Sequence, residues 1–106
     1  MTRDEILAKS AGRYLDALIA ERIFHYYDVP DHAHYSTNIA DAWMVVEKMI
    51  EKYEFALEFN AEEFNLEWWA VFFLDDELES LFDAAAPNAP EAICKAALLA
   101  VMEEEK

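Results

Sequence analysis

The sequence predicts an α/β protein of the α+β kind. We expect a three-layer α-β-α sandwich around a small antiparallel sheet of two to three strands, with three to four helices. The first observation is residues 66–74, which read Leu-Glu-Trp-Trp-Ala-Val-Phe-Phe-Leu. Aromatic and β-branched residues favour a strand here, and both of its faces are apolar, so we expect cover on both sides. The second observation is that apolar residues recur at helical spacing before and after this strand.

The composition is that of one packed domain, spanning residues 1–106. The chain is 56% hydrophobic and 14% aromatic, which is ample for a core. Cys94 is the only cysteine, so no intrachain disulfide can form, as is typical of a reducing cytoplasm. No apolar run reaches the roughly 18 residues of a membrane span. We therefore expect a soluble, cytoplasmic protein that has no membrane partner.

Residues 2–24 predict helix, with bounds of about 3–23. Thr2 and Glu5 have the spacing of a capping box, and Leu7, Leu15 and Ile19 follow at helical spacing. Gly12 is the only glycine in the chain. It either breaks this segment into two helices, the second from about Ser10, or is a tolerated glycine within one helix.

The segment 25–37 predicts a loop, and it contains all three histidines. His32 and His34, with Asp28 or Asp31, are the candidate metal ligands, because imidazole and carboxylate suit Zn²⁺ or Ni²⁺. No cysteine pair and no His-Glu-x-x-His motif accompanies them. We therefore expect an aromatic, solvated loop and neither a metal nor a cofactor.

The remaining elements follow from spacing and cap residues. Residues 38–52 predict a helix with an apolar stripe, and Ser36, Thr37 or Asn38 can cap its start. Residues 53–59 alternate as a strand that pairs antiparallel with 66–74 through a turn at 60–63. Residues 78–84 predict either a short third strand or a short helical turn. Asn88, Pro90 and Glu91 mark the start of a last helix, 89–103. Cys94 on its apolar face reads as a core residue and not as a nucleophile. The predicted core is Trp43, Phe55, Trp68, Phe72, Ile93 and Leu98.

The negative charge of the chain is concentrated in its middle. The formal net charge is −15, and residues 47–83 hold twelve acids against two bases, or 2 − 12 = −10. Such a segment disfavours direct binding of nucleic acid or of an anionic membrane, and it suits a basic partner. Residues two apart on a strand lie about 6.6 Å apart, near two phosphate steps of about 3.4 Å along one DNA strand. The predicted partner-binding residues form an acidic edge: Glu54, Glu58, Glu62, Glu63, Glu67, Asp75, Asp76 and Glu77.

Four stretches, in order along the chain, form a recognisable set. They are Thr2 to Glu21 with Glu5-Ile-Leu, Ala11-Gly-Arg and Asp16-Ala-Leu-Ile-Ala; Tyr35-Ser-Thr with Ile39-Ala and Ala42-Trp; Trp68-Trp-Ala-Val-Phe; and Ala89-Pro with Ala92-Ile-Cys-Lys-Ala-Ala-Leu. Together they resemble the phage ABA sandwich domain family of small phage and prophage proteins. The resemblance implies an α/β three-layer sandwich and a bacterial host, and it brings no catalytic motif. This chain departs from the family pattern in the loop after Phe24, which lacks glycine, and in the acidity of residues 54–83.

These observations favour a binding protein over an enzyme. The sequence has no glycine-rich phosphate loop, no Ser/His/Asp order and no Cys/His pairing of recognisable spacing. The leading hypothesis is a small acidic phage-type protein that inhibits a host nucleic-acid-binding or defence enzyme through its acidic surface, as anti-CRISPR proteins and DNA mimics do.

Two alternatives stay open. One is a sponge for a host signalling nucleotide, with Tyr26, Tyr27, Tyr35 and Trp69 as stacking residues; it requires three arginines to converge. These three arginines are Arg3, Arg13 and Arg22. The other alternative is a structural or homodimeric accessory protein without a ligand.

Overall fold

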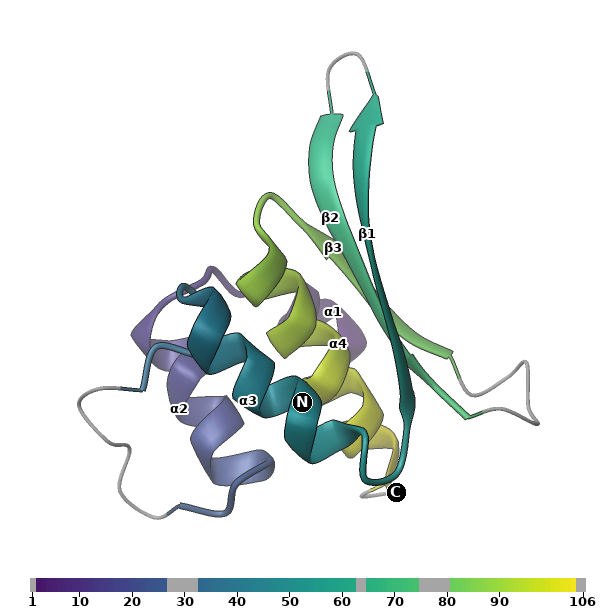
Figure 1. Ribbon diagram of the computed structural model, residues 1–106. Coiled ribbons are helices and arrows are strands. Elements are labelled where there is room, and N and C mark those ends of the chain that lie inside the picture. Colours follow the sequence, from purple (N-terminus) through teal and green to yellow (C-terminus); the bar gives the residue numbers. More distant parts are fainter. Residues whose placement is uncertain (1, 27–32, 63–64, 75–80, 105–106) are drawn as a thin grey trace.

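The structure is a computed structural model that describes residues 2–26, 33–62, 65–74 and 81–104. The side chains of residues 62 and 65 are outside this description. The predicted fold class is confirmed: four helices accompany a three-stranded antiparallel sheet of order β1-β2-β3 (Figure 1). The elements are α1 (Arg3–Ala8), α2 (Arg13–Arg22), α3 (Ile39–Met49), β1 (Glu54–Glu62), β2 (Asn65–Phe73), β3 (Leu81–Ala86) and α4 (Ala89–Glu104).

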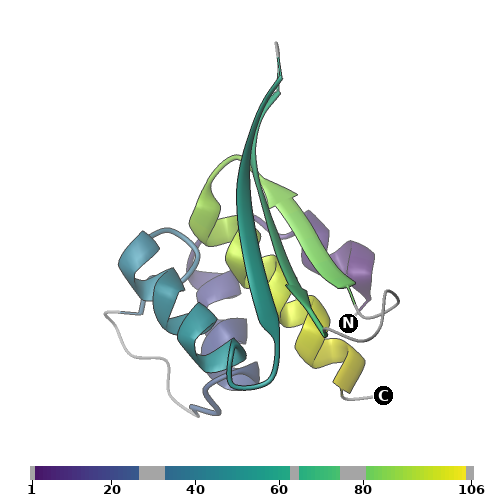
Figure 2. The same cartoon turned by 45° about the vertical axis from the view of Figure 1, so that its right-hand side comes forward.

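The helices described lie on one side of the sheet. α4 packs directly on β2 and β3, and α1, α2 and α3 pack on α4 (Figures 1 and 2). The other face of the sheet carries no helix among the described residues, which differs from the cover on both sides that the apolar strand predicts. The physical reason is that an antiparallel sheet can leave one face to water, and glutamates on β1 make that face polar.

The helix starts follow the predicted caps. Thr2 and Glu5 form the capping box of α1, and the Asn38 side chain accepts from the Asp41 N–H at the start of α3. Asn88 likewise accepts from the Glu91 N–H, 3.3 Å away. The open alternative for residues 2–24 is resolved in favour of two helices, because α1 ends at Ala8 with Lys9 as its C-cap and α2 begins at Arg13 and not near Ser10. Gly12 is the N-cap of α2 and has a φ of 141°. L side chains rarely adopt this conformation, so glycine is needed at the break.

The strands keep the predicted alternation and extend it. β1 and β2 pair antiparallel with Phe55 opposite Phe72, and β1 runs to Glu62, beyond the predicted end at residue 59. Of the predicted turn at 60–63, residues 60–62 therefore belong to the strand and residue 63 lies outside the described residues. The third strand is Leu81–Ala86, so the helical-turn alternative is wrong there; residues 78–80 lie outside the described residues.

The core surrounds α4, with the sheet on one side of this helix and α1, α2 and α3 on the other. Phe72, Ile93 and Leu98 are buried as predicted, and Phe55 and Trp68 are half-buried against the same cluster. Trp43 is wrong as a core prediction, because 46% of it is exposed. It lies on the flank of the apolar stripe of α3, where it packs edge-on against the Phe55 ring with centroids 6.0 Å apart.

Residues 92–100 of α4 are buried all round, which is why this central helix lacks a polar face. Cys94 is fully buried there, and burial, with the charges of Asp16 and Glu91, raises the pKa of its thiol well above the ordinary value. A thiol in this state is not a nucleophile, so the core assignment agrees with the structure.

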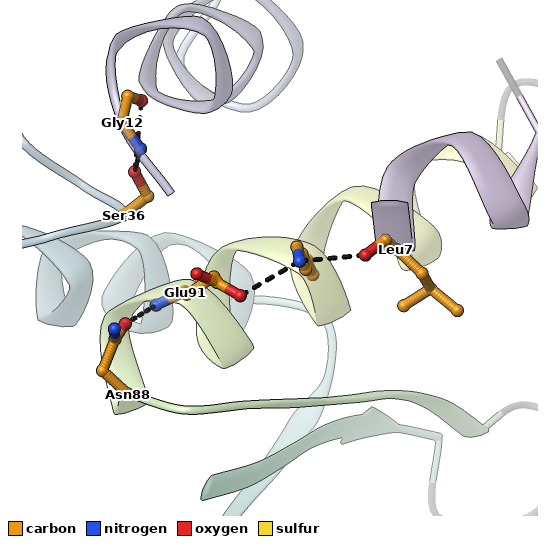
Figure 3. Close-up of polar contacts among 6 residues, drawn as sticks. Leu7, Gly12, Ser36, Asn88 and Glu91 are labelled. Atoms are coloured by element: carbon orange, nitrogen blue, oxygen red, sulfur yellow. Dashed lines mark hydrogen bonds and ion pairs between the residues drawn. The ribbon is translucent and has the colours of Figure 1, made fainter. Parts of the chain in front are cut away.

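A buried polar cluster fixes the loop before α3 to α2. Asp16 is 3% exposed and accepts from both the Ser36 N–H at 2.7 Å and the Ser36 hydroxyl at 2.6 Å. The Ser36 oxygen in turn accepts from the Gly12 N–H at 2.8 Å (Figure 3). Each buried polar atom named here has a partner, so the cluster is read as structural support for the fold.

Candidate protein-binding surface

The uncovered face of the sheet, here called the outer face, is built by strand alternation. The antiparallel register places Glu54 opposite Phe73, Glu58 opposite Trp69, and Asn60 opposite Glu67. On the far side of β2, Trp69 is opposite Ala85 and Val71 is opposite Asp83. Because successive side chains alternate between faces, these residues share one face, opposite the buried row that contains Ala70 and Phe72.

A hollow of about 360 Å³ lies on this face. It is lined by Glu58, Phe59, Asn60, Glu67, Trp69 and Ala85. The Trp69 indole is half-buried, and its Nε1–H donates to Asp83 Oδ2 at 3.0 Å. A large aromatic surface is therefore held in place beside two carboxylates, which suits a partner side chain that is cationic and has an apolar stem.

The structure brings three of the predicted acidic-edge residues together. The outer face carries Glu54, Glu58 and Glu67, and the hollow is lined by Glu58 and Glu67. Glu62 lies in β1, opposite Asn65. The other predicted members are outside the described residues: Glu63, Asp75, Asp76 and Glu77.

The carboxylates on the outer face are sparser than a DNA backbone. Glu54 and Glu58 are four residues apart, with Ala56 between them, so they are separated by about 13 Å along β1. Phosphates follow one another at about 3.4 Å along one DNA strand. The described part of this face therefore offers roughly one charge for every four phosphate steps, and Glu67 on β2 adds a second row.

The predicted acidic edge omits one acid of the outer face, and Trp69 enters the sequence predictions only as a nucleotide-stacking candidate. Asp83 on β3 belongs to the outer face, and Trp69 lies between it and the glutamates of β1. The alternation of β2 already placed Trp69 on the same face as Glu67. No local signal could have placed Asp83, because its position depends on the register of β3 against β2.

A second pocket, of about 410 Å³, lies where three helices end. Arg22, Lys48 and Lys52 contribute to its lining, and so do Glu51 and Glu104. The C-termini of α2, α3 and α4 meet there, and each carries a partial negative charge. The bases are therefore read as compensating three helix dipoles and two carboxylates, and the pocket has no excess of positive charge for an anion.

The arrangement does not assemble the predicted nucleotide site within the described residues. Arg22 lines this pocket, whereas Arg3 and Arg13 do not. Arg13 and Arg22 lie at opposite ends of α2, about 13 Å apart along its axis. Tyr35 is 4% exposed and stacks on Phe24 at 5.2 Å, so its ring faces the core and not a ligand. Tyr26 is exposed and Tyr27 lies outside the described residues.

The candidate metal ligands are described only in part. His34 is exposed, and its backbone N–H donates to Asp41 Oδ2 at 3.0 Å. His32, Asp28 and Asp31 lie outside the described residues. Across the described ranges, no group of three or more His, Cys, Asp or Glu side chains is placed to hold a metal ion.

At the edge of the second pocket, Glu104 ties the end of α4 to the start of β1. It accepts from the Tyr53 hydroxyl at 2.6 Å and pairs with Lys52 Nζ at 2.6 Å. Burial alone would raise the pKa of Glu104, but these two contacts outweigh it and lower the pKa below the ordinary value of 4.5. Burial and the bond to Glu104 raise the pKa of Tyr53 well above its usual range.

We expect the Glu104→Gln variant to melt below the wild type near pH 7 and to approach it in acid. A lowered carboxyl pKa contributes stability that is present above the unfolded value and is lost as pH falls through the folded value. The difference in melting temperature should therefore shrink as the pH drops below about 4.5. Thermal unfolding followed by circular dichroism between pH 3 and 7 measures this. Glu21→Gln, at an exposed site on α2, should show no such trend.

The chain was compared with known proteins. A model of the phage ABA sandwich domain family matches residues 17–98. A crystal structure of a phage protein from Bacillus cereus ATCC 14579 is similar, with 27% sequence identity and a TM-score of 0.68, over 89% of this chain and 92% of that one. A search of curated proteins found no match. Among the described residues, no helix combines the length and the apolar character needed to cross a membrane.

The family match covers every helix and strand except α1, the start of α2 and the end of α4. It agrees with the four helices and the antiparallel sheet described above, and with the resemblance seen in the sequence. The chain belongs to the phage ABA sandwich domain family.

Proposed function

We propose that this protein is a phage-type binding protein that presents the outer face of its sheet to a basic surface on a host protein. The observation that carries the proposal is the combination of Glu58, Glu67 and Trp69 around one hollow on a face without helices among the described residues. A fixed aromatic ring flanked by carboxylates is a suitable receptor for lysine and arginine side chains.

The partner class follows from charge. At −15, the chain repels nucleic acid and attracts proteins that bind nucleic acid. We therefore propose a host nucleic-acid-binding enzyme in the bacterial cytoplasm, inhibited by occupation of its basic channel. An anti-CRISPR or DNA-mimic activity is the specific form of this proposal. We propose that the protein acts by binding and not by catalysis.

The test is charge reversal on the outer face. The Glu58→Lys/Glu67→Lys variant serves as bait in host lysate beside the wild type and a control, Asp4→Lys/Glu21→Lys. Both variants change the net charge by four, from −15 to −11, but Asp4 and Glu21 are exposed residues of α1 and α2. The control separates the position of the charges from their number.

We expect a basic protein to be captured by the wild type and the control, and to be lost with the outer-face variant. Duplex DNA should release the captured protein from the bait, because DNA and the bait would compete for the same basic channel. Raised salt should weaken this complex by screening, while it raises the melting temperature of the free, self-repelling protein. If the captured protein binds the outer-face variant as tightly as the wild type, the outer face is not the interface. Release by salt but not by DNA would exclude mimicry.

A further inference from the structure

Among the described residues, the first strand of the sheet has one edge without a partner strand. Within the described residues β1 pairs with β2 alone, along all nine of its residues. In an antiparallel sheet, every second residue of such a strand points its backbone N–H and C=O away from the paired neighbour. A long edge of this kind is a template on which another extended chain can add as a further strand.

An apolar surface runs beside this edge, and we call it the α3–β1 patch. α3 and β1 diverge from the turn that joins them (Figures 1 and 2). The edge-on contact between the Trp43 and Phe55 rings connects the two elements. The patch consists of apolar side chains that are exposed or half-buried on or beside the two elements. Its members are Ile39, Trp43 and the C-cap residue Ile50 of α3, and Phe55, Leu57 and Phe59 of β1.

The exposure of this patch is large for apolar side chains. Ile39 is 52% exposed, Trp43 46% and Ile50 53%, and these three lie within about 40° of one another around the α3 axis. Phe59 is 51% exposed on the face of β1 that Phe55 shares. Large apolar side chains exposed in this number on two neighbouring elements are typical of a binding site.

Protection against aggregation explains the acidic residues on the β1 edge but not the exposed apolar side chains of the α3–β1 patch. Charged residues on an edge strand prevent unwanted pairing, and Glu54 and Glu58 could have that role. An edge built only for protection has no need of large apolar side chains in water. Here acids and apolar residues alternate along the same strand, so each face of an added strand would meet a different chemistry.

We propose that the β1 edge binds an extended segment of the partner in which basic and apolar residues alternate. The segment adds as a strand beside β1. Its apolar side chains pack on the α3–β1 patch, and its lysines or arginines point to the outer face, near Glu54 and Glu58. This inference rests on the proposed function, because it uses the same acidic face for the partner's bases, and it specifies how the partner is recognised.

A second copy of the chain fits this edge less well. Antiparallel pairing of β1 with the same strand of another molecule would bring the outer-face glutamates Glu54 and Glu58 of both copies together. Like charges directly opposite each other destabilise a strand pair. A segment with the opposite charge pattern removes this repulsion, so charge complementarity favours a basic partner strand.

The probe is a nine-residue peptide in which lysine and valine alternate. Its control has the same composition with the lysines and valines in two blocks, so that charge is matched and alternation is lost. Binding to the full chain is measured by nuclear magnetic resonance titration and by hydrogen exchange of the β1 amides. We expect the alternating peptide to bind at least tenfold more tightly and to protect the alternate β1 amides that face away from β2.

Two neutral substitutions test the patch. Trp43→Gln should weaken binding of the alternating peptide at least tenfold, whereas Met44→Gln should leave it unchanged. Met44 is 49% exposed on the same helix but about 100° further round, so the pair is matched for exposure and polarity. Ile39→Gln, at the first residue of α3, is a second patch variant should Trp43→Gln unfold by circular dichroism.

The outcomes separate this inference from the proposed function. Equal binding of both peptides, lost in Glu58→Lys/Glu67→Lys, would overturn strand addition and leave the acidic face as the interface. Absence of binding, or protection of no β1 amide, would also overturn strand addition, while the lysate experiment tests the acidic face independently. A wild-type dimer that Trp43→Gln converts to a monomer would identify a second copy as the occupant and overturn the proposal.

Discussion

Truncating Phe72 to alanine should lower the free energy of unfolding by about 3–5 kcal/mol. Phe72 has no exposed surface, and its ring lies 4.9 Å from that of Phe55, between the sheet and α4. The loss combines the transfer free energy of the ring with the cavity that it leaves. For a domain whose total stability is typically about 5–15 kcal/mol, this is a large fraction.

The matched control is Phe59→Ala. Phe59 is the same residue type on the same face of the sheet, but it is 51% exposed, so its truncation should cost about 1 kcal/mol or less. Urea unfolding followed by circular dichroism measures both values, with the slope m checked to be unchanged. A cost below about 1 kcal/mol for Phe72→Ala would show that the sheet and α4 do not pack as described.

The elements that the sequence predicts well are those governed by local chemistry. The alternation of β1 and β2 assigns each side chain to its face, because a strand has a fixed period of two. The caps at Thr2, Asn38 and Asn88 follow from short polar side chains that satisfy N–H groups at helix starts. The helical segments and the antiparallel pair were therefore predictable to within a few residues.

The features that the sequence predicts poorly depend on how elements meet. Trp43 has the correct spacing for a core residue, yet it lies on the flank of α3 because α4 covers only part of the apolar stripe. The uncovered outer face was not predicted for a similar reason. The apolar pattern of residues 66–74 does not determine which face of the sheet the helices cover. Asp83 reaches that face only through the register of β3. Packing direction and register are long-range quantities that no local pattern encodes.

The same limit applies to Lys95, which sequence reasoning left unremarked. Lys95 is 5% exposed within the all-round buried part of α4. Its Nζ donates to the Leu7 carbonyl at 3.0 Å and to Glu91 Oε2 at 3.1 Å (Figure 3 shows both acceptors). The Leu7 carbonyl is close to the C-terminus of α1, so the lysine satisfies a helix-end acceptor and docks α1 on α4. A charged residue in this place needs both partners.

Replacing Lys95 with methionine should lower the free energy of unfolding by about 3–5 kcal/mol. Methionine nearly preserves the volume of the side chain, so the loss is electrostatic: the Glu91 carboxylate, whose side chain is 13% exposed, loses its partner, and the Leu7 carbonyl loses its donor. Urea unfolding measures the cost, and limited proteolysis at α1 reports whether the helix detaches.

The double variant Lys95→Met/Glu91→Gln distinguishes the buried charge from general damage to α4. The introduced glutamine carries no charge, so the stranded carboxylate is removed, while the Leu7 carbonyl stays unpaired. We expect the double variant to be more stable than Lys95→Met alone, with a remaining cost of about 1–3 kcal/mol for the carbonyl. Additive losses from the two substitutions would mean that Lys95 and Glu91 are not coupled, and that α1 is held to α4 by apolar contacts such as those of Ile6.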